Sequence, residues 1–243
     1  MDKKVTPYGD SSLGKKEQVT KMFDTISGKY DGLNRVISFG IDVKWREKVV
    51  SMINNTHPES VLDIATGTGD LAINMALQTN ANKIVGLDIS PGMLEVGKQK
   101  VSQKKLSEKI EMVLGDSEAL PFEDNYFDAV TVAFGVRNFE DLEKGLSEIF
   151  RVLKKGGIFV VLETSVPTKP PYKQGYNIYT RGILPLIGKV FSKDRSAYAY
   201  LSKSASVFPF GEDFNNILRK IGFTNVKDRP QTFGVATIYE AYK

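Results

Sequence analysis

Cysteine is absent from this chain of 243 residues, and histidine and tryptophan occur once each. Without cysteine the chain forms no disulfide and holds no metal through thiolates, and a reducing compartment suits it. The one histidine, His57, stands in the polar stretch 54–58. That stretch predicts an exposed turn and not a catalytic group. We expect no metal site.

Long apolar runs are also missing. The longest ones are a few residues, far short of the roughly 20 that cross a membrane, and the amino terminus lacks the apolar core of a secretory signal. The net charge of +4 is small for this length, and the lysines are dispersed instead of forming a stripe for nucleic acid. We therefore expect a cytoplasmic protein that is soluble or lies on the inner face of a membrane, with no nucleic-acid partner.

The most informative stretch is 61–70, with the sequence VLDIATGTGD. Its apolar residues predict a buried parallel strand, and a glycine-rich turn and an amphipathic helix follow at once. Gly67 and Gly69 let the backbone approach a ligand where a Cβ atom would collide. A second apolar run, 83–88, ends nineteen residues past Gly69 in Asp88, where a carboxylate can bind a ribose diol. The pattern predicts a site for an adenine nucleoside or dinucleotide.

The choice between these two ligands rests on the residues around the turn. The stretch 67–72 also fits the loose dinucleotide fingerprint G-x-G-x-x-G/A. Asp63, inside the first strand, suits the methionine ammonium of S-adenosylmethionine and has no task beside a pyrophosphate. A third run, 109–114, leads to Asp116 and Ser117 where an adenine edge would lie, and about sixty residues precede the first strand. These features favour S-adenosylmethionine.

Thr68, Asp88 and Asp116 are the residues of this pattern whose roles need a further argument. Thr68 can reach the carboxylate end of the donor through its backbone and hydroxyl, and the N-terminus of the following helix favours an anion. Asp88 has an alternative role as a cap of the next helix, and Asp116 as a simple turn residue. Their places after successive strands favour the ligand in both cases.

The hydrophobic periodicity predicts an α/β fold with a mostly parallel sheet and helices on both faces. A helix is expected from Glu17, and a second from about Asp42 as its N-cap. Strands are expected near 60–65, 83–88, 110–114, 127–134 and 157–163, helices near 69–79, 91–105, 141–154 and 211–221, and a C-terminal antiparallel hairpin from 224–229 and 232–242. This seven-stranded arrangement is the one expected of class I methyltransferases, a Rossmann-like fold.

We divide the chain accordingly. Residues 1–16 are polar and expected to be mobile, and 17–243 form one domain. Within it we expect an N-terminal helical cap (17–56), a donor-binding core (57–164), an insertion (165–210) and a closing helix and hairpin (211–243). The insertion carries five prolines and many tyrosines and is long for a plain loop, which points to a function.

Arg137 and Asn138 follow the fourth strand and are expected to face the crevice at the carboxyl ends of the strands. The alternative for Arg137 is a structural salt bridge to a helix acid such as Glu140 or Glu143.

Four stretches resemble the ubiquinone/menaquinone biosynthesis C-methyltransferase family. Tyr30 to Trp45 is similar to its first signature, Y-D-x-[M/L]-N-x-x-[L/I]-S-x-x-x-H-x-x-W. The stretch 151–157 resembles its second signature, and 134–138 (FGVRN) and 200–209 look like the family too. The chain departs from the pattern twice. Asp42 replaces a histidine, which puts a general-base role there in doubt, and Ala133 replaces a serine near the donor.

The resemblance implies methylation of a ring carbon of a prenylated quinol by S-adenosylmethionine, with demethylmenaquinol as the first acceptor to test. The equivalent reaction on a prenyl-benzoquinol in ubiquinone biosynthesis, or another small-molecule methylation, stays open. Arg137 cannot readily act as a base, because its pKa exceeds about 12, but it can stabilise a phenolate. Asn138 and Tyr30 can orient the ring oxygens.

In the same reading, the insertion 165–210, including 178–191, covers the acceptor or meets the membrane that holds the prenyl tail, and an ordinary packed flap is the alternative. A homodimer is compatible with the sequence. Two functions of other classes also remain: an oxidoreductase with a nicotinamide site, and a donor-binding module without catalysis.

Overall fold

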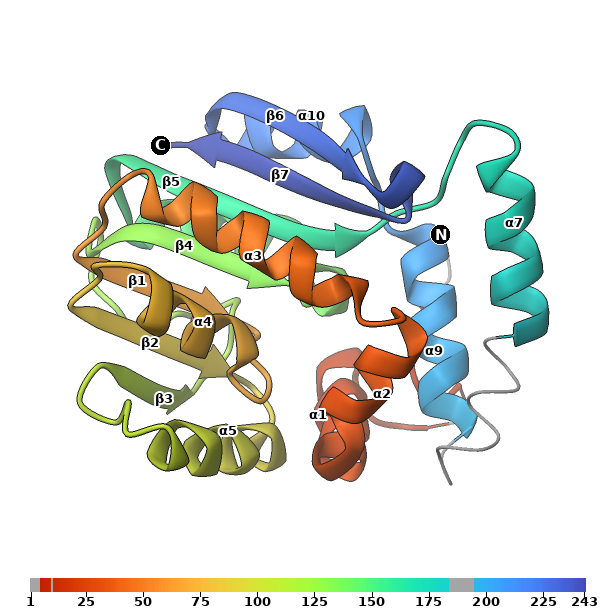
Figure 1. The fold of residues 1–243 in the computed structure, drawn as a ribbon, viewed down its shortest axis with the longest axis horizontal. Helices are drawn as coiled ribbons and strands as arrows, with labels where there is room; N and C mark the ends of the chain where they lie inside the picture. Colours follow the sequence, from red (N-terminus) through yellow and green to blue (C-terminus); the bar gives the residue numbers. More distant parts are fainter. Residues whose placement is uncertain (1–4, 10, 184–194) are drawn as a thin grey trace.

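The computed structural model describes residues 5–9, 11–183 and 195–243. In these ranges one seven-stranded sheet has the order β3-β2-β1-β4-β5-β7-β6 (Figure 1). The neighbours among β1 to β5 pair in parallel, whereas β7 runs antiparallel to both β5 and β6. The strands are β1 (Ser60–Ile64), β2 (Lys83–Asp88), β3 (Ile110–Leu114), β4 (Phe127–Ala133), β5 (Leu153–Thr164), β6 (Thr224–Gln231) and β7 (Ala236–Tyr242).

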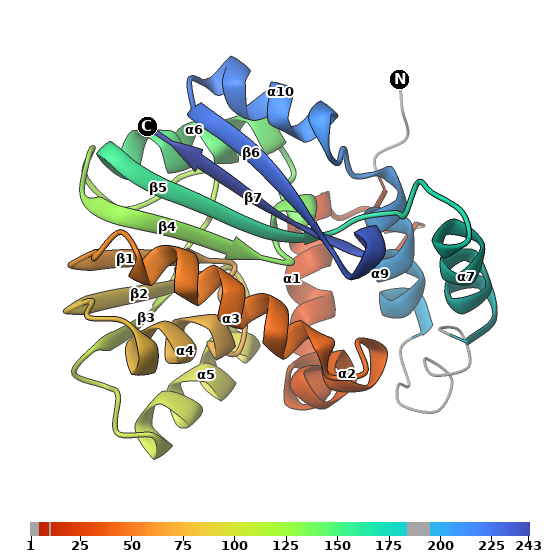
Figure 2. The ribbon, with the colours of Figure 1, turned by 45° about the horizontal axis from the view of Figure 1, so that its top comes forward.

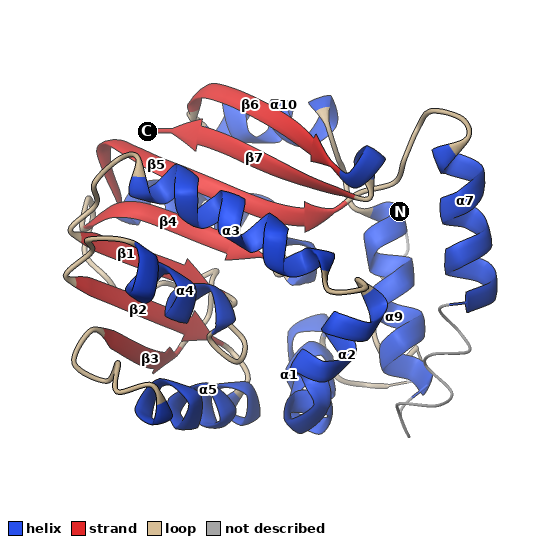
Figure 3. Cartoon of the chain, in the orientation of Figure 1, coloured by secondary structure: helices blue, strands red, loops and turns tan. Residues whose placement is uncertain are grey.

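Helices cover both faces of the sheet, with α3, α4 and α5 on one and α6 and α10 on the other (Figures 2 and 3). The helices are α1 (Lys15–Ile26), α2 (Tyr30–Ile37), α3 (Ile41–Asn54), α4 (Asp70–Gln78), α5 (Pro91–Gln103), α6 (Leu142–Val152), α7 (Tyr172–Ile178), α9 (Arg195–Val207) and α10 (Glu212–Ile221), with shorter turns η1 (Ser27–Lys29), η2 (Val136–Asn138), η3 (Tyr179–Ile183) and η4 (Thr232–Gly234). Within the described ranges, we find every helix too short or too polar to pass through a bilayer.

Strand β5 shows how the sequence pattern produces a sheet that is covered by helices on both faces. Ile158, Val160 and Leu162 pack with α3 and α4, whereas Phe159 and Val161 pack with α6 and α10. Side chains alternate across a strand, so a strand with helices on both faces must be apolar at successive positions. The continuous apolar run predicted a buried parallel strand, and the predicted methyltransferase-type sheet with its closing hairpin is confirmed.

The predicted start of α3 was wrong. Gly40, and not Asp42, is the N-cap, with a left-handed φ of 75° that glycine adopts without strain. Asp42 lies inside the first turn, where it is buried against Arg35 and Arg46. A carboxylate interacts favourably with the helix dipole both at the N-cap and within the first turn. The sequence pattern therefore did not distinguish these two positions for Asp42, and its ion pairs with Arg35 and Arg46 favour the position inside the helix.

The N-terminal helices lie at the carboxyl ends of the strands, together with α7 and α9 (Figure 2). Asp24 of α1 accepts hydrogen bonds from the Ser90 hydroxyl (2.6 Å) and the Gly92 amide (2.8 Å) at the start of α5. A carboxylate there also interacts favourably with the positive end of the helix dipole. This contact holds α1 beside the strand ends, where it can form a wall of a ligand site.

The residues before α1 contact that helix. Helix α1 begins at Lys15, and the backbone amide of Tyr8 donates to the Gln18 side chain at 2.8 Å. Residues 1–4 and 10 lie outside the described residues, so the mobility of 1–16 stays a prediction.

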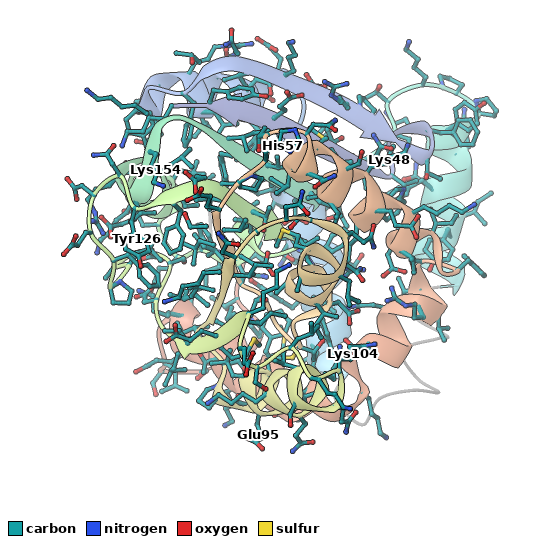
Figure 4. All side chains as sticks on the ribbon, turned by 60° about the vertical axis from the view of Figure 1, so that its left-hand side comes forward. Lys48, His57, Glu95, Lys104, Tyr126 and Lys154 are labelled. Carbon is teal, nitrogen blue, oxygen red and sulfur yellow. The ribbon has the colours of Figure 1, made fainter. Side chains whose placement is uncertain are left out.

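The insertion 165–210 is largely helical where it is described, and residues 184–194 lie outside the described residues. His57 lies in an exposed turn between α3 and β1, as predicted (Figure 4).

Candidate functional site

A pocket of about 670 Å³ opens where β1, β2 and β4 end; we name it the strand-end pocket. It lies at the point where the chain order of the sheet reverses, between β1 and β4, which is where open α/β sheets bind their ligands. Helix α1 closes one side of it. Its walls are formed by Lys16, Val19, Phe23, Tyr30, Ile64, Ala65, Gly67, Leu87, Asp88, Ile89, Met93, 115–118, 133–135 and 138–140.

Asp88 is buried at the base of this pocket and receives two backbone amides. Its Oδ2 accepts from Gly67 at 2.7 Å, and its Oδ1 accepts from Ser90 at 2.9 Å. Burial raises the pKa of the Asp88 carboxyl to about 6, against the opposing effect of these amides. Each carboxylate oxygen has a second lone pair, so the group can accept two more donors such as those of a diol.

Asp63 lies deeper, at the end of β1, and is 1% exposed. The hydroxyls of Thr66 (2.6 Å) and Thr131 (2.7 Å) donate to its two oxygens. Burial raises the pKa of this carboxyl to about 6 as well, because desolvation outweighs both hydrogen bonds. Asp63 lines a smaller hollow of about 350 Å³ around the glycine turn, the glycine-loop pocket.

Left-handed backbone at Gly67 (φ 58°) and Gly69 (φ 80°) shapes the turn. The Thr68 hydroxyl between them is already engaged. It donates to Asp31 at 2.6 Å and accepts from Lys100 at 3.1 Å. The structure therefore turns the hydroxyl toward α2 and α5, and only the backbone of Thr68 is available for the contact that we expected it to make.

Asp116 and Ser117 both line the strand-end pocket, as their position after β3 predicted. Asp116 Oδ2 accepts from the Lys16 ammonium at 2.6 Å, and its Oδ1 accepts from the Glu118 amide at 2.9 Å. Lys16 also reaches the Glu118 carboxylate, at 3.1 Å. This lysine of α1 was not foreseen, because no local pattern places it opposite residues one hundred positions away.

A second pocket, of about 950 Å³, lies between α2 and α3 on one side and α7 and α9 on the other; we name it the α7 pocket. Its walls are largely aromatic and aliphatic. They are formed by Tyr30, Asn34, Ile37, Ser38, Asp42, Trp45, Arg46, Phe134, Arg137, Thr164, Tyr176, Tyr179, Thr180, Leu201, Ser202, Ala205 and Val235. Tyr30 and Phe134 also line the strand-end pocket, so the two pockets share these walls.

Arg137 points into the α7 pocket and is 7% exposed. Its Nη1 donates to Glu163 at the end of β5 and to the Phe134 carbonyl (3.0 Å). Burial would lower the pKa of the guanidinium, but the Glu163 carboxylate raises it above its ordinary value, so Arg137 stays charged. Its buried Nε has no hydrogen-bond partner among the residues that the structure describes. An unpaired buried donor is rare, and here it belongs to a side chain that lines a cavity.

Arg137 forms a salt bridge, the alternative that we considered, but with Glu163 of β5 and not with the helix acid Glu143. Glu143 instead pairs with Lys220 of α10 at 2.9 Å. Glu163 takes its place because it ends the last parallel strand, directly beside β4. The rule that parallel strands end at one edge of the sheet could have found this residue.

Asn138 and Tyr30 both line the strand-end pocket, but only Tyr30 also lines the α7 pocket. Asn138 lines the strand-end pocket, where its Oδ1 accepts from the Tyr200 hydroxyl of α9 at 3.0 Å. Tyr30 lines both of the larger pockets and the glycine-loop pocket, and burial raises the pKa of its phenol. Of the three residues expected to act on the acceptor, Arg137 and Tyr30 therefore reach the α7 pocket, and Asn138 does not line it.

Asp42 contributes to the wall of the α7 pocket but is a poor candidate base. It is paired with Arg35 and Arg46 and accepts from the Ser38 hydroxyl at 2.6 Å. Burial alone would raise its pKa, but the Ser38 hydroxyl and the two guanidinium groups hold the pKa of Asp42 below its ordinary value. A carboxylate with a lowered pKa takes up a proton reluctantly.

Comparison with known proteins agrees with this geometry. The model of the ubiE/COQ5 methyltransferase family matches residues 12–243. A demethylmenaquinone methyltransferase of Bacteroides fragilis is 48% identical over 99% of this chain and 98% of its own. A demethylmenaquinone methyltransferase of Porphyromonas gingivalis is 42% identical, also over 99% of this chain and 98% of its own. The ubiquinone/menaquinone biosynthesis C-methyltransferase UbiE of Geobacter sulfurreducens is 44% identical over all of this chain and 94% of its own.

Solved structures share the fold at much lower identity. A SAM-dependent methyltransferase from Aquifex aeolicus aligns with a TM-score of 0.57 and 18% identity, over 81% of this chain and 88% of its own. The [4+2]-cyclase SpnF aligns with a TM-score of 0.67 and 17% identity, over 96% and 97%. A cyclase among these structures shows that the fold alone does not decide the reaction.

Proposed function

Because the chain belongs to the ubiE/COQ5 methyltransferase family, we propose that it methylates a ring carbon of demethylmenaquinol. S-adenosylmethionine is its methyl donor, as membership of this methyltransferase family indicates. The proposal of a naphthoquinol rests on the relatives from Bacteroides and Porphyromonas, whose names specify that acceptor. The benzoquinol of ubiquinone biosynthesis is the alternative to test.

The residues around the strand-end pocket fit the donor. Asp88 has free lone pairs for the two hydroxyls of a ribose. Asp116 and Ser117 line the same pocket as apolar Leu87 and Ile89, which suits an adenine ring with polar edges. We therefore keep Gly67, Thr68 and Gly69, with Asp63, Asp88, Asp116 and Ser117, as the proposed donor-binding residues.

The methionine end of the donor fits the glycine-loop pocket. Asp63 offers a carboxylate to the ammonium group there. Arg46 lines the same hollow and, together with the Thr68 amide, can face the donor's carboxylate. Arg46 was not a sequence candidate, because nothing in its helical repeat separates it from a surface arginine.

One observation carries the proposal for the acceptor: a charged, incompletely paired arginine lines an apolar pocket that shares two walls with the donor pocket. A planar quinol with an apolar tail matches such a lining, and it would lie across Tyr30 and Phe134 from the donor. Holding both reactants in line is worth up to roughly 7–11 kcal/mol in model systems.

The proposed chemistry follows from these positions. When bound, the donor supplies an electrophilic sulfonium methyl group. Ionisation of a quinol hydroxyl raises the electron density on the neighbouring ring carbon, and the Arg137 guanidinium lowers the free energy of the resulting phenolate. The new C–C bond forms as the C–S bond breaks. The ring carbon then loses its proton to water, the ring becomes aromatic again and the phenolate oxygen takes up a proton, so that one proton is released for each methyl group transferred. Tyr30 orients a ring oxygen with its phenol, which stays protonated because its pKa is raised.

The direct test is incubation of the purified protein with labelled donor and a panel of reduced prenyl naphthoquinols and benzoquinols. We expect label in the naphthoquinol, with mass spectrometry placing it on the ring carbon. Label only in the benzoquinol would transfer the proposal to ubiquinone biosynthesis, and label in neither would contradict it. Titration with NADH tests the oxidoreductase alternative, and we expect no binding.

Activity should require the reduced acceptor. An oxidised quinone is electron-poor and cannot attack a sulfonium carbon, so assays with quinone alone should give no product until a reductant is added. Product formation is measured under strict exclusion of reductant and again after adding dithionite. Equal turnover in both assays would contradict a quinol nucleophile.

Donor affinity should fall as the pH drops through about 6. Asp88 and Asp63 both have pKa values near 6 in the free protein, and the donor's hydroxyl and ammonium groups favour their ionised forms. The dissociation constant for S-adenosylhomocysteine should therefore rise about tenfold per group between pH 7.5 and pH 5. Calorimetry across this range checks it. Asp88→Asn should bind weakly at every pH with a shallower slope, whereas a flat wild-type profile would exclude both carboxyls from the site.

We also keep the membrane as a proposed partner, because the acceptor's prenyl tail belongs in lipid. Self-association stays a prediction, and light scattering over a range of protein concentrations tests it.

A further inference from the structure

Helix α7 and the turn η3 that follows it contact the body of the protein through two aromatic pairs. Tyr172 stacks on Phe233 of η4 with ring centroids 4.0 Å apart, and Tyr179 contacts Phe39, between α2 and α3, at 6.0 Å. Phe39 is 72% exposed and Phe233 66%, and Ile178 on α7 is exposed to a similar extent. Phe39, Tyr172, Ile178 and Phe233 form what we name the aromatic seam. Figure 2 shows α7 as the outermost helix at this end of the molecule.

The backbone at two seam residues makes their identity unusual. Phe39 has φ 51° and Phe233 has φ 60°, in the left-handed region that favours glycine and asparagine. A phenylalanine there pays conformational strain without the compensation of burial. Exposed apolar groups gathered on one surface indicate an interaction, so these two rings point to a surface that covers them in the working protein.

The charge of the chain indicates what that surface is. The insertion 165–210 holds seven basic residues and one acid, a net charge of +6 in a chain whose total is +4. The rest of the chain is therefore negative by two. Lys169 and Lys173 are exposed on this segment, next to Tyr172, and Lys44 is exposed on α3. Basic and aromatic side chains together are typical of segments that lie on an anionic lipid surface.

The seam also adjoins the α7 pocket. Ser38 and Tyr179 line that pocket, and each is next in sequence to a seam residue, Phe39 and Ile178. Val235 lines it from the end of η4, two residues after Phe233. A prenyl tail that leaves the pocket between α7 and the body thus meets apolar side chains and then solvent, unless lipid lies there.

We propose that the aromatic seam docks on an anionic lipid bilayer, so that the α7 pocket opens toward the membrane and the acceptor's tail stays in lipid. Phe39 and Phe233 enter the interface, where aromatic rings are favoured, and Lys169 and Lys173 contact the headgroups. The link to the acceptor rests on the function proposed above, but the docking itself is independent of it.

Sedimentation with vesicles tests the docking without any acceptor. The probes are vesicles of phosphatidylcholine alone and of phosphatidylcholine with phosphatidylglycerol. We expect binding to the anionic vesicles that weakens with salt. Lys169→Glu with Lys173→Glu should reduce it roughly tenfold or more, whereas Lys98→Glu with Lys104→Glu, the same charge change on and just after α5 (Figure 4), should not.

The rings are tested with Phe39→Asn and Phe233→Asn combined, because asparagine tolerates the left-handed backbone. This variant should lose vesicle binding at an unchanged melting temperature. The control is Leu77→Asn, which removes a 59% exposed side chain from α4. Equal vesicle binding by the ring variant, equal loss in the control, or no wild-type binding to either vesicle would overturn the proposal. So would a dimer in lipid-free buffer that the ring variant abolishes, since a second copy would then cover the seam.

Activity assays separate this proposal from the proposed function. With a long-tailed quinol in anionic vesicles, the ring variant should lose at least tenfold in turnover. With a short-tailed, water-soluble quinol it should equal the wild type. Loss in both assays would mean that the rings serve the pocket and not the membrane. Absence of any quinol methylation by the wild type would instead refute the function and leave the vesicle result standing.

Discussion

The Asp88→Ala variant should bind S-adenosylhomocysteine at least a hundredfold more weakly than the wild type. A carboxylate that accepts two ribose hydroxyls makes charge-assisted bonds worth about 1.5–3 kcal/mol each, and alanine removes both. The Gly67 and Ser90 amides that donate to Asp88 also lose their acceptor, so the glycine turn itself is loosened. Calorimetry measures the affinity, and circular dichroism shows whether the fold is intact.

A matched control separates binding from stability. Asp128 also accepts a backbone amide, that of Ser60 at 2.9 Å, and it pairs with Lys154 at the opposite end of the sheet (Figure 4). Asp128→Ala should therefore lower the melting temperature while donor affinity stays unchanged. An unaltered dissociation constant in Asp88→Ala, or an equal weakening in Asp128→Ala, would remove Asp88 from the donor site.

The Arg137→Lys variant should lose about a hundredfold or more in kcat while donor affinity barely changes. Lysine keeps the positive charge but has neither the planar fork nor the Nε–H group, which is the unpaired donor of Arg137. Loss of one preorganised donor to a developing oxyanion typically costs 10²–10³ in rate. Stopped-time assays with saturating reduced acceptor give kcat, and calorimetry with S-adenosylhomocysteine gives the donor affinity.

The choice of lysine follows from the burial of Glu163, which is fully buried beside Arg137. Alanine at position 137 would leave that carboxylate unpaired, at a cost of about 3–5 kcal/mol in stability, and activity would then follow folding. Arg151→Lys is the control, because Arg151 pairs with Glu148 and Asp124 away from both pockets. Normal turnover in Arg137→Lys, or a loss that matches its loss of folded protein, would reduce Arg137 to a structural ion pair.

Much of the fold could be predicted from the sequence, because the patterns that indicate it depend on residues close together in the chain. The apolar run of β1, the glycines after it and the acid that ends β2 lie within about thirty residues. Strand alternation, helical spacing and left-handed turns depend on near neighbours only. The α/β alternation predicts parallel strands, and the carboxyl ends of parallel strands meet at one edge of the sheet. The crevice and Asp63, Asp88, Asp116 and Ser117 around it could therefore be placed in advance, whereas the order of the strands comes from the structure.

Tertiary structure alone decided which partners these residues have. Glu163 beside Arg137, Lys16 beside Asp116 and Asp31 beside Thr68 join positions 26 to 100 residues apart. Such pairs leave no periodic trace, because an acid or a base on a helix surface looks alike whether its partner is water or another side chain. The same holds for the α7 pocket, whose walls come from both ends of the chain and meet only when α7 and α9 fold back over α2 and α3. The local pattern therefore determined the donor crevice, and long-range packing determined the shape and charge of the pocket proposed for the acceptor.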